Sequence, residues 1–162
     1  MTVVSNTSPI TNLARIGHLW ILQRLYVEIH IPTAVQHELR KGIELRRHPS
    51  DFFETNSWIK VQPASNKELV QSLLNSLGRG EAECIALGVE LQANLIVIDE
   101  RRGSRLARQM GLRSTGTLGV VIDAKHQGII DTVRPVVDLL REQANFWLSD
   151  AVYEAFLQSA GE

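Results

Sequence analysis

The sequence predicts an α/β fold with three layers, in which a central, mostly parallel sheet of about five short strands lies between helices. Segments with strand character alternate along the chain with segments of helical periodicity, which is typical of a parallel sheet with helical crossovers. The run Leu95–Ile98 is apolar throughout, as expected of a strand that is buried on both faces. No repeat or linker divides the chain, so we expect one domain at 1–162, with a helical segment at about 133–162.

Apolar runs and turn residues define the elements of the N-terminal half. Val3 and Val4 form a short first strand that ends at Ser5. Ser8 and Pro9 then suit the cap and the first position of a helix that continues to the next glycine. The following elements are a helix at 18–26, a strand at 27–31, a helix from 33 that Gly42 stops, a loop with a helical turn at 42–57, and a strand at 58–61.

The C-terminal half continues the alternation of strands and helices. Ser65 or Asn66 caps a helix that ends near Gly78. The next elements are a helix at 81–92, the apolar strand at 95–98, a helix that ends at Gly111, a strand at 112–117, and a helix at 118–127. From residue 133 the chain is helical, and Ser149 with Asp150 caps the last helix.

Composition excludes several classes of protein. The net charge is −1, so the surface as a whole does not attract nucleic acid, and any such contact needs a local basic patch. A single cysteine, Cys84, rules out an intrachain disulfide and gives no sign of secretion. The start of the chain lacks the features of a signal peptide, and no apolar run approaches the roughly 20 residues of a membrane span. We therefore expect a cytoplasmic protein without a membrane partner.

Four polar positions stand where predicted strands end or helices begin: Asn6, Glu38, Glu81 and Asp99. Ligands of an open α/β sheet bind at the carboxyl ends of its strands, so these side chains can converge there. Their oxygens are the ligands that Mg²⁺ and Mn²⁺ prefer, and such ions promote phosphodiester cleavage. The pattern predicts a divalent metal site whose first ligand is an amide and not an acid.

Each acid also has a purely structural interpretation. Asp99 or Glu100 can cap the helix that follows, and because side chains alternate along a strand, only one of the two is expected to face the site. Glu81, with Glu83 as its close competitor, is equally suited to a helix N-terminus. Glu38 has the spacing of an exposed helical glutamate. The shared topology of these acids, and no single residue, carries the prediction of a site.

Four arginines crowd the helix after Asp99, at positions Arg101, Arg102, Arg105 and Arg108. Helical spacing puts the first, third and fourth on one face. This face is either a solvated surface or a contact for the phosphates of a nucleic acid beside the metal. Ser8 is a further candidate contact, and the hydroxyls around Asn6 suit either turns and caps or the orientation of a metal ligand or a bound water.

Six segments in a fixed order carry a family resemblance. They are VVSNTSPITNLARIG, IPTAVQHEL, GRGEAECIALGVEL, LIVIDERRGSRLARQMGL, STGTLGVVIDAKHQGII and FWLSDAVYEAFLQSAGE. Each segment alone is a weak signal, but the ordered set is specific and covers nearly the whole chain. It closely resembles a prokaryotic branch of the PIN-domain family that is related to VapC-like toxins.

The resemblance implies a parallel sheet with an acidic pocket for Mg²⁺ or Mn²⁺ and a ribonuclease selective for single strands. It also implies a homodimer, and a toxin that a small antitoxin neutralises. The family's first aspartate falls on Asn6, its second acid on Glu38, its third on Glu81 and its fourth on Asp99. A further family acid falls at 115–117, where this chain has no carboxylate. The amide at the first position can coordinate a cation through its carbonyl oxygen but brings no charge.

Three functional hypotheses follow. The first is a metal-dependent endoribonuclease, the toxin of a toxin–antitoxin pair. The second is a catalytically weak or inactive PIN module that binds RNA or a protein partner, which the amide at position 6 and the acid-free stretch at 115–117 favour. The third is a receiver-like phosphoacceptor domain, which would need an acid pair where Ser5 and Asn6 stand. The last helix, with Leu148, Val152 and Phe156 on one side, either packs on the core or contacts a second copy or an antitoxin.

Overall fold

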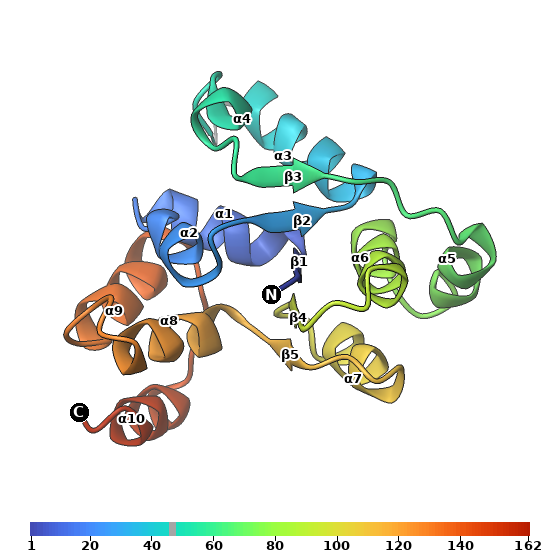
Figure 1. The fold of residues 1–162 in the computed structure, drawn as a ribbon. Helices are drawn as coiled ribbons and strands as arrows, with labels where there is room; N and C mark the ends of the chain where they lie inside the picture. Colours follow the sequence, from blue (N-terminus) through green and yellow to red (C-terminus); the bar gives the residue numbers. More distant parts are fainter. Residues whose placement is uncertain (46–47) are drawn as a thin grey trace.

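The computed structural model describes residues 1–45 and 48–162, so residues 46 and 47 of the loop predicted at 42–57 lie outside the described part. In the described residues a five-stranded sheet, parallel throughout, has the strand order β3-β2-β1-β4-β5 (Figure 1). Its strands are β1 (Val3–Ser5), β2 (Ile29–Ile31), β3 (Ile59–Val61), β4 (Leu95–Val97) and β5 (Ser114–Thr115). The predicted parallel α/β architecture is confirmed.

Helices connect the strands and complete the layers on both faces of the sheet. They are α1 (Thr7–Arg15), α2 (Trp20–Tyr26), α3 (Thr33–Glu44), α4 (Phe52–Thr55), α5 (Lys67–Leu73), α6 (Arg79–Glu90), α7 (Arg101–Gln109), α8 (Thr117–His126), α9 (Arg134–Gln143) and α10 (Asp150–Ser159). In Figure 1, α5, α6 and α7 lie on one side of the sheet, and α1, α2, α8 and α9 on the other. No helix of the described residues is long and apolar enough to cross a membrane.

Alternation along the short strands produces two separate apolar cores. Val3 and Val97 face α1, α2, α8 and α9, whereas Val4 and Ile96 face α5, α6 and α7. All four side chains are fully buried, because successive side chains of a strand point to opposite faces and both faces are covered. β1 and β4 are therefore apolar on both faces except at Ser5, the last residue of β1, and the acids of the predicted site lie outside these strands.

Register places the carboxyl ends of the central strands side by side. Ser5 of β1 pairs with Val97 of β4, which in turn pairs with Thr115 of β5. The backbone N–H of Asn6 continues the ladder by donating to the Val97 carbonyl at 2.9 Å. Residues that follow β1, β4 and β5 thus meet at one edge of the sheet, although more than 90 residues of sequence separate β1 from β5.

Three predicted helix boundaries are wrong. The helix capped by Asn66 ends at Leu73 and not near Gly78. α1 begins at Thr7 with Asn6 at the N-cap, so Ser8 lies exposed in the first turn and does not cap the helix. α3 does not stop at Gly42 but runs to Glu44. Gly42 serves packing instead, because a Cβ there would lie 2.6 Å from Cδ2 of the His48 ring.

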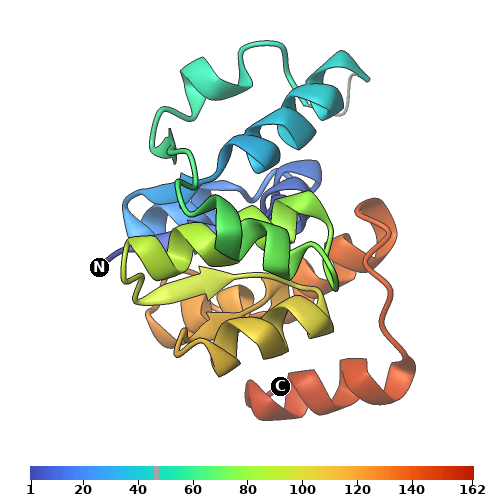
Figure 2. The same ribbon diagram turned by 90° about the vertical axis from the view of Figure 1, so that its right-hand side faces the viewer.

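The last helix also departs from its predicted orientation. Its buried residues are Tyr153 and Leu157, whereas Val152 is 49% exposed. Ser149 caps the helix as predicted, by accepting a hydrogen bond from the Val152 amide at 3.1 Å. Figure 2 shows α10 joined to α9 by an extended segment that leaves the body of the molecule. Leu148 lies in this segment and Val152 in the first turn of α10. Only part of the apolar side predicted for the last helix is therefore packed.

Candidate active site

Asp99 follows β4 and is held at the edge of the sheet by two neighbouring elements. The backbone N–H of Thr117 donates to its Oδ1 at 2.6 Å, and the Thr117 hydroxyl donates to Oδ2 at 2.7 Å. The Asn12 amide of α1 makes a longer contact with Oδ2 at 3.4 Å. Gly116 permits this approach, because a Cβ there would lie 2.7 Å from Oδ1. The carboxylate is therefore oriented by donors from α8 and α1.

Glu100, the neighbour of Asp99, has a structural role at the start of α7. It is the N-cap of α7, and its carboxylate accepts hydrogen bonds from the backbone N–H groups of Arg102 at 3.1 Å and Gly103 at 2.6 Å. A carboxylate at a helix N-terminus is stabilised both by these unpaired donors and by the helix dipole. Of the two adjacent acids, Glu100 caps the helix and Asp99 faces the edge where the strands end.

Asn6 occupies the corresponding place after β1. The residue is only 4% exposed, and its side-chain oxygen, Oδ1, is buried without a hydrogen-bond partner among the described residues. An unpaired buried carbonyl is rare in folded proteins, since leaving it unsatisfied costs about 1–3 kcal/mol. The carbonyl oxygen of Asn6 is thus an acceptor that the protein itself does not satisfy.

Glu38 reaches the first turn of α6, in which the carboxylate of Glu81 lies beside the N-cap Gly78. The Thr7 hydroxyl donates to the carboxylate of Glu38, and a Cβ at Gly80 would lie 2.6 Å from Glu38 Oε1. Glu81 lies in that same first turn. Burial, together with the nearby charges of Glu81 and Glu38, raises the pKa of the Cys84 thiol, so both carboxylates lie within electrostatic range of one buried sulfur.

Glu83, the competitor of Glu81, ties two helices together. Its Oε1 accepts a hydrogen bond from the Ala34 backbone N–H at 3.1 Å, at the start of α3. Its Oε2 lies 3.4 Å from Nη1 of Arg79 in an ion pair along α6. Both oxygens are therefore engaged in contacts away from Asn6, which leaves Glu81 as the acid of α6 that is not engaged in this way.

The carboxylates of Glu38, Glu81 and Asp99 form no ion pair with a basic side chain of the described residues. Asn6 lies between them along the edge: its neighbour Thr7 binds Glu38, and its backbone binds the strand that precedes Asp99. Within 1–45 and 48–162, however, no three His, Cys, Asp or Glu side chains form a group that could hold a metal ion. Glu38 and Asp99 line separate pockets, and the described residues do not form a closed set of carboxylates around Asn6.

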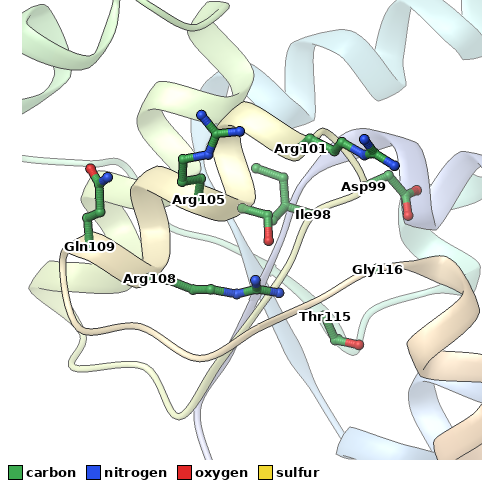
Figure 3. Close-up of a pocket in the computed structure, with 9 residues that line it drawn as sticks. Ile98, Asp99, Arg101, Arg105, Arg108, Gln109, Thr115 and Gly116 are labelled. Carbon is green, nitrogen blue, oxygen red and sulfur yellow. The ribbon is translucent and has the colours of Figure 1, made fainter.

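The predicted arginine face lines a pocket beside Asp99. Arg101, Arg105 and Arg108 surround an opening with a volume of about 660 Å³ (Figure 3). Arg108 extends across it, and its Nε donates to the Ser114 hydroxyl at 2.9 Å. The side chain of Arg101 lies on the same side of the opening as the carboxylate of Asp99. This side of α7 therefore offers positive charge next to a carboxylate that has no counter-ion in the described protein.

The other two predicted nucleic-acid contacts lie elsewhere. Nη1 of Arg102 donates to the carbonyl of Ser76 at 3.2 Å, which draws the side chain away from the arginine pocket. Ser8 lines a second pocket, on the α1–α3 side, together with Glu38 and Lys41. Both residues therefore lie outside the opening that the three other arginines share with Asp99.

Two residues of the site have no counterpart in the sequence-based interpretation. Thr117 is completely buried, and it donates twice to Asp99 at the place where the family pattern has a further acid. Asn12 reaches the same carboxylate from the middle of α1. A short polar residue is common at a helix start, so Thr117 carried no distinctive signal, and the partner of Asn12 depends on how α1 packs against the end of β4.

Comparison with known proteins agrees with the fold described above. A family model described as a PIN domain matches residues 2–162. No curated protein and no solved structure matches the chain. PIN domains are generally nucleases and typically use divalent metal ions. On the length of this match, the chain belongs to the PIN-domain family.

Proposed function

We propose that this protein is a metal-dependent endoribonuclease that selects single-stranded RNA and acts in the cytoplasm. The observation that carries the proposal is the buried, unpartnered Oδ1 of Asn6, a residue at the carboxyl edge of the sheet whose neighbour Thr7 binds Glu38 and whose backbone pairs with the strand before Asp99. An unsatisfied acceptor at an edge that also carries acids without ion-pair partners favours a cation. The arginine pocket next to Asp99 offers the complementary contact for a phosphate backbone.

The donors at this edge fit Mg²⁺ or Mn²⁺ in their chemistry. The carbonyl oxygen of Asn6 and the carboxylates of Asp99, Glu38 and Glu81 are all hard oxygen ligands, and the described residues supply no basic side chain to neutralise the acids. A cation bound there would supply charge for the phosphate and an activated water. Asn6 would contribute an oxygen without charge, so we expect weaker binding than for a site with four acids.

The remaining residues of the edge position these groups. Thr117 and Asn12 donate to Asp99, which fixes the direction of its oxygens. Thr7 does the same for Glu38 from the first turn of α1. Arg101 borders both the arginine pocket and Asp99, where its guanidinium can bind a phosphate of the RNA backbone.

A second function is supported by the amide at position 6 and by the absence of a carboxylate at 115–117. In this alternative the protein binds RNA in the arginine pocket without cutting it. A ligand set in which an amide replaces one acid would hold a divalent ion too weakly for catalysis, whereas the arginines would still bind phosphates.

Cleavage of a labelled RNA separates the two functions. We expect wild-type protein to cut a single strand in Mn²⁺ or Mg²⁺, to cut a duplex poorly, and to be inactive in excess EDTA. Asp99→Asn should lower the rate at least about 100-fold, the magnitude typical of losing a charged group that acts on the transition state. Asp131→Asn, which changes an exposed acid away from this edge, is the matched control. If wild-type and Asp99→Asn proteins are equally inert while both bind the RNA, the binding function is correct.

We also propose that the protein is a toxin, neutralised by a small antitoxin, and that it forms a homodimer. The resemblance of the ordered segments to the branch of the family related to VapC-like toxins supports this proposal. Light scattering of the purified protein tests the dimer, and co-expression with the product of the adjacent gene tests the antitoxin. A monomer that remains monomeric and does not bind that product contradicts both parts of this proposal.

A further inference from the structure

Trp147 is the most exposed large apolar side chain of the described residues, at 84%. It lies between α9 and α10, and its backbone is anchored on both sides. The Phe146 N–H donates to the Leu140 carbonyl at 3.1 Å, and Ser149 caps α10. The indole ring is thus presented to solvent from a fixed position, where folding gains almost nothing from its apolar surface.

Two hollows adjoin this ring. One is also lined by Leu148 and Val152 and has a volume of about 640 Å³, and the other lies towards Arg141. The larger hollow shares Asp99, Arg101 and Gly116 with the arginine pocket. An aromatic, mostly apolar hollow and a basic pocket therefore meet at Asp99, and Arg101 belongs to both.

This juxtaposition matches the chemistry of an unpaired nucleic-acid strand, in which charged phosphates alternate with flat bases. Proteins that hold single strands combine a positively charged groove with aromatic side chains on which bases stack. A duplex cannot offer a base to the ring, because its bases are stacked and paired inside the helix. The hollow thus suits the base of a nucleotide, and the arginine pocket suits the phosphate next to it. Arg101 lies on the phosphate side.

We propose that the hollow formed by Trp147, Leu148 and Val152 is a stacking subsite for an unpaired base of RNA, adjacent to the phosphate held at Arg101. This inference rests on the proposed function for its choice of RNA, and it adds the residue that would select single strands. It requires that base stacking on Trp147 contribute to binding whether or not the strand is cut.

The test is the affinity for a fluorescent single-stranded oligoribonucleotide, measured by anisotropy in EDTA so that cleavage plays no part. Trp147→Ala should weaken binding about tenfold, which corresponds to about 1.4 kcal/mol. Trp147→Phe, which keeps an aromatic ring, should lose less than about threefold. Trp20→Ala is the matched control, because this tryptophan is also exposed but lines none of the pockets at this edge.

An oligonucleotide with abasic positions identifies the contact as stacking. Wild-type protein should bind it about tenfold more weakly than the intact strand, whereas Trp147→Ala should bind the two equally. The proposal is overturned if wild-type protein does not bind the intact strand, or if Trp147→Ala binds it as tightly as wild type. It is also overturned if this substitution converts a dimer into a monomer in light scattering, since the hollow would then belong to a second copy.

The nuclease function can fail separately. If RNA is not cleaved in manganese but Trp147→Ala still weakens binding, the stacking subsite is correct and the nuclease proposal is wrong. If cleavage depends on Asp99 but binding is indifferent to Trp147, the nuclease proposal is correct and the subsite is wrong.

Discussion

The ends of β1 and β4 are neighbours in the sheet, yet the polar side chains that follow them differ in their hydrogen bonding. After β4, Asp99 receives two short hydrogen bonds from Thr117 and a longer one from Asn12. After β1, the side-chain oxygen of Asn6 is buried and receives none from the described residues. One strand end therefore has a charged group that the fold orients, and the next has a neutral acceptor that the fold leaves unsatisfied.

For the proposed metal site, this difference explains how a cation could bind although one charge is missing. The energetic cost of desolvating Asn6 is incurred on folding, because the register of β1 and β4 fixes its backbone. A ligand that satisfies its oxygen would recover that cost on binding. In that site Asp99 would contribute negative charge and oxygens that point in a fixed direction. Asn6 would contribute an oxygen that gains a partner only when a ligand binds.

Restoring the charge at the end of β1 should have the largest effect. In EDTA, Asn6→Asp should lower the free energy of unfolding by about 3 kcal/mol at neutral pH, because a buried carboxylate would stand unpaired near other acids. Excess Mn²⁺ should reverse the loss and stabilise this variant more than wild type. Urea denaturation with and without the ion measures both effects.

The pH dependence of this variant has a definite sign. Burial raises the pKa of such a carboxyl above its value in the unfolded chain, so the loss should shrink as the pH falls and the group takes up a proton. Asn66→Asp is the control, because that side chain caps α5 and should show no response to Mn²⁺. An Asn6→Asp protein that is as stable as wild type in EDTA would show that the amide is not an unsatisfied acceptor.

Removing one of the hydrogen bonds to Asp99 should have a smaller effect on stability. Thr117→Val removes the hydroxyl donor, but it keeps the backbone donor and the shape of the side chain. We expect a loss of about 1–2 kcal/mol in the free energy of unfolding, since the residue is completely buried, together with slower cleavage. Thr132→Val, on the exposed loop before α9, should change neither quantity. An unchanged urea midpoint for Thr117→Val would contradict the orienting role.

Glu100→Gln tests whether Glu100 and Asp99 have the different roles described above, the first as a helix cap and the second in the site. Because Glu100 caps α7, the substitution should cost about 0.5–1 kcal/mol of stability and leave the cleavage rate of the folded protein unchanged. Thermal unfolding and single-turnover cleavage, measured beside Asp99→Asn, provide the comparison. A loss of cleavage as large as that of Asp99→Asn would place Glu100 in the site instead.

Asn12→Ala should have the smallest effect, because its contact with Asp99 is long at 3.4 Å. We expect a loss of about 0.5 kcal/mol or less in the free energy of unfolding, and a change in cleavage of no more than about threefold. The same two assays apply. An effect larger than that of Thr117→Val would identify Asn12 as the main restraint on Asp99.

Much of the fold follows from local sequence patterns. The apolar run before Asp99 predicted a strand buried on both faces, and Ile96 and Val97 are fully buried in it. The cap of the last helix was also correct, because Ser149 acts on an amide three residues away. The error at Gly42 arose where the ring of His48, a neighbour in space, packs against the glycine. The error at the start of α1 is a shift of the N-cap by two residues, from Ser8 to Asn6.

The sequence by itself determined the order of strands and helices and the set of polar residues at their junctions, since both depend on nearest neighbours along the chain. Only the tertiary structure decided the roles within that set: Asp99 faces the edge and Glu100 caps a helix, and Glu83 ties α3 to α6. The physical reason is that the roles of Asp99 and Glu83 depend on hydrogen bonds between distant residues, such as Asn12 and Asp99, which lie 87 positions apart in sequence. No periodicity encodes such a pair, because it exists only once the strands have taken their places in the sheet.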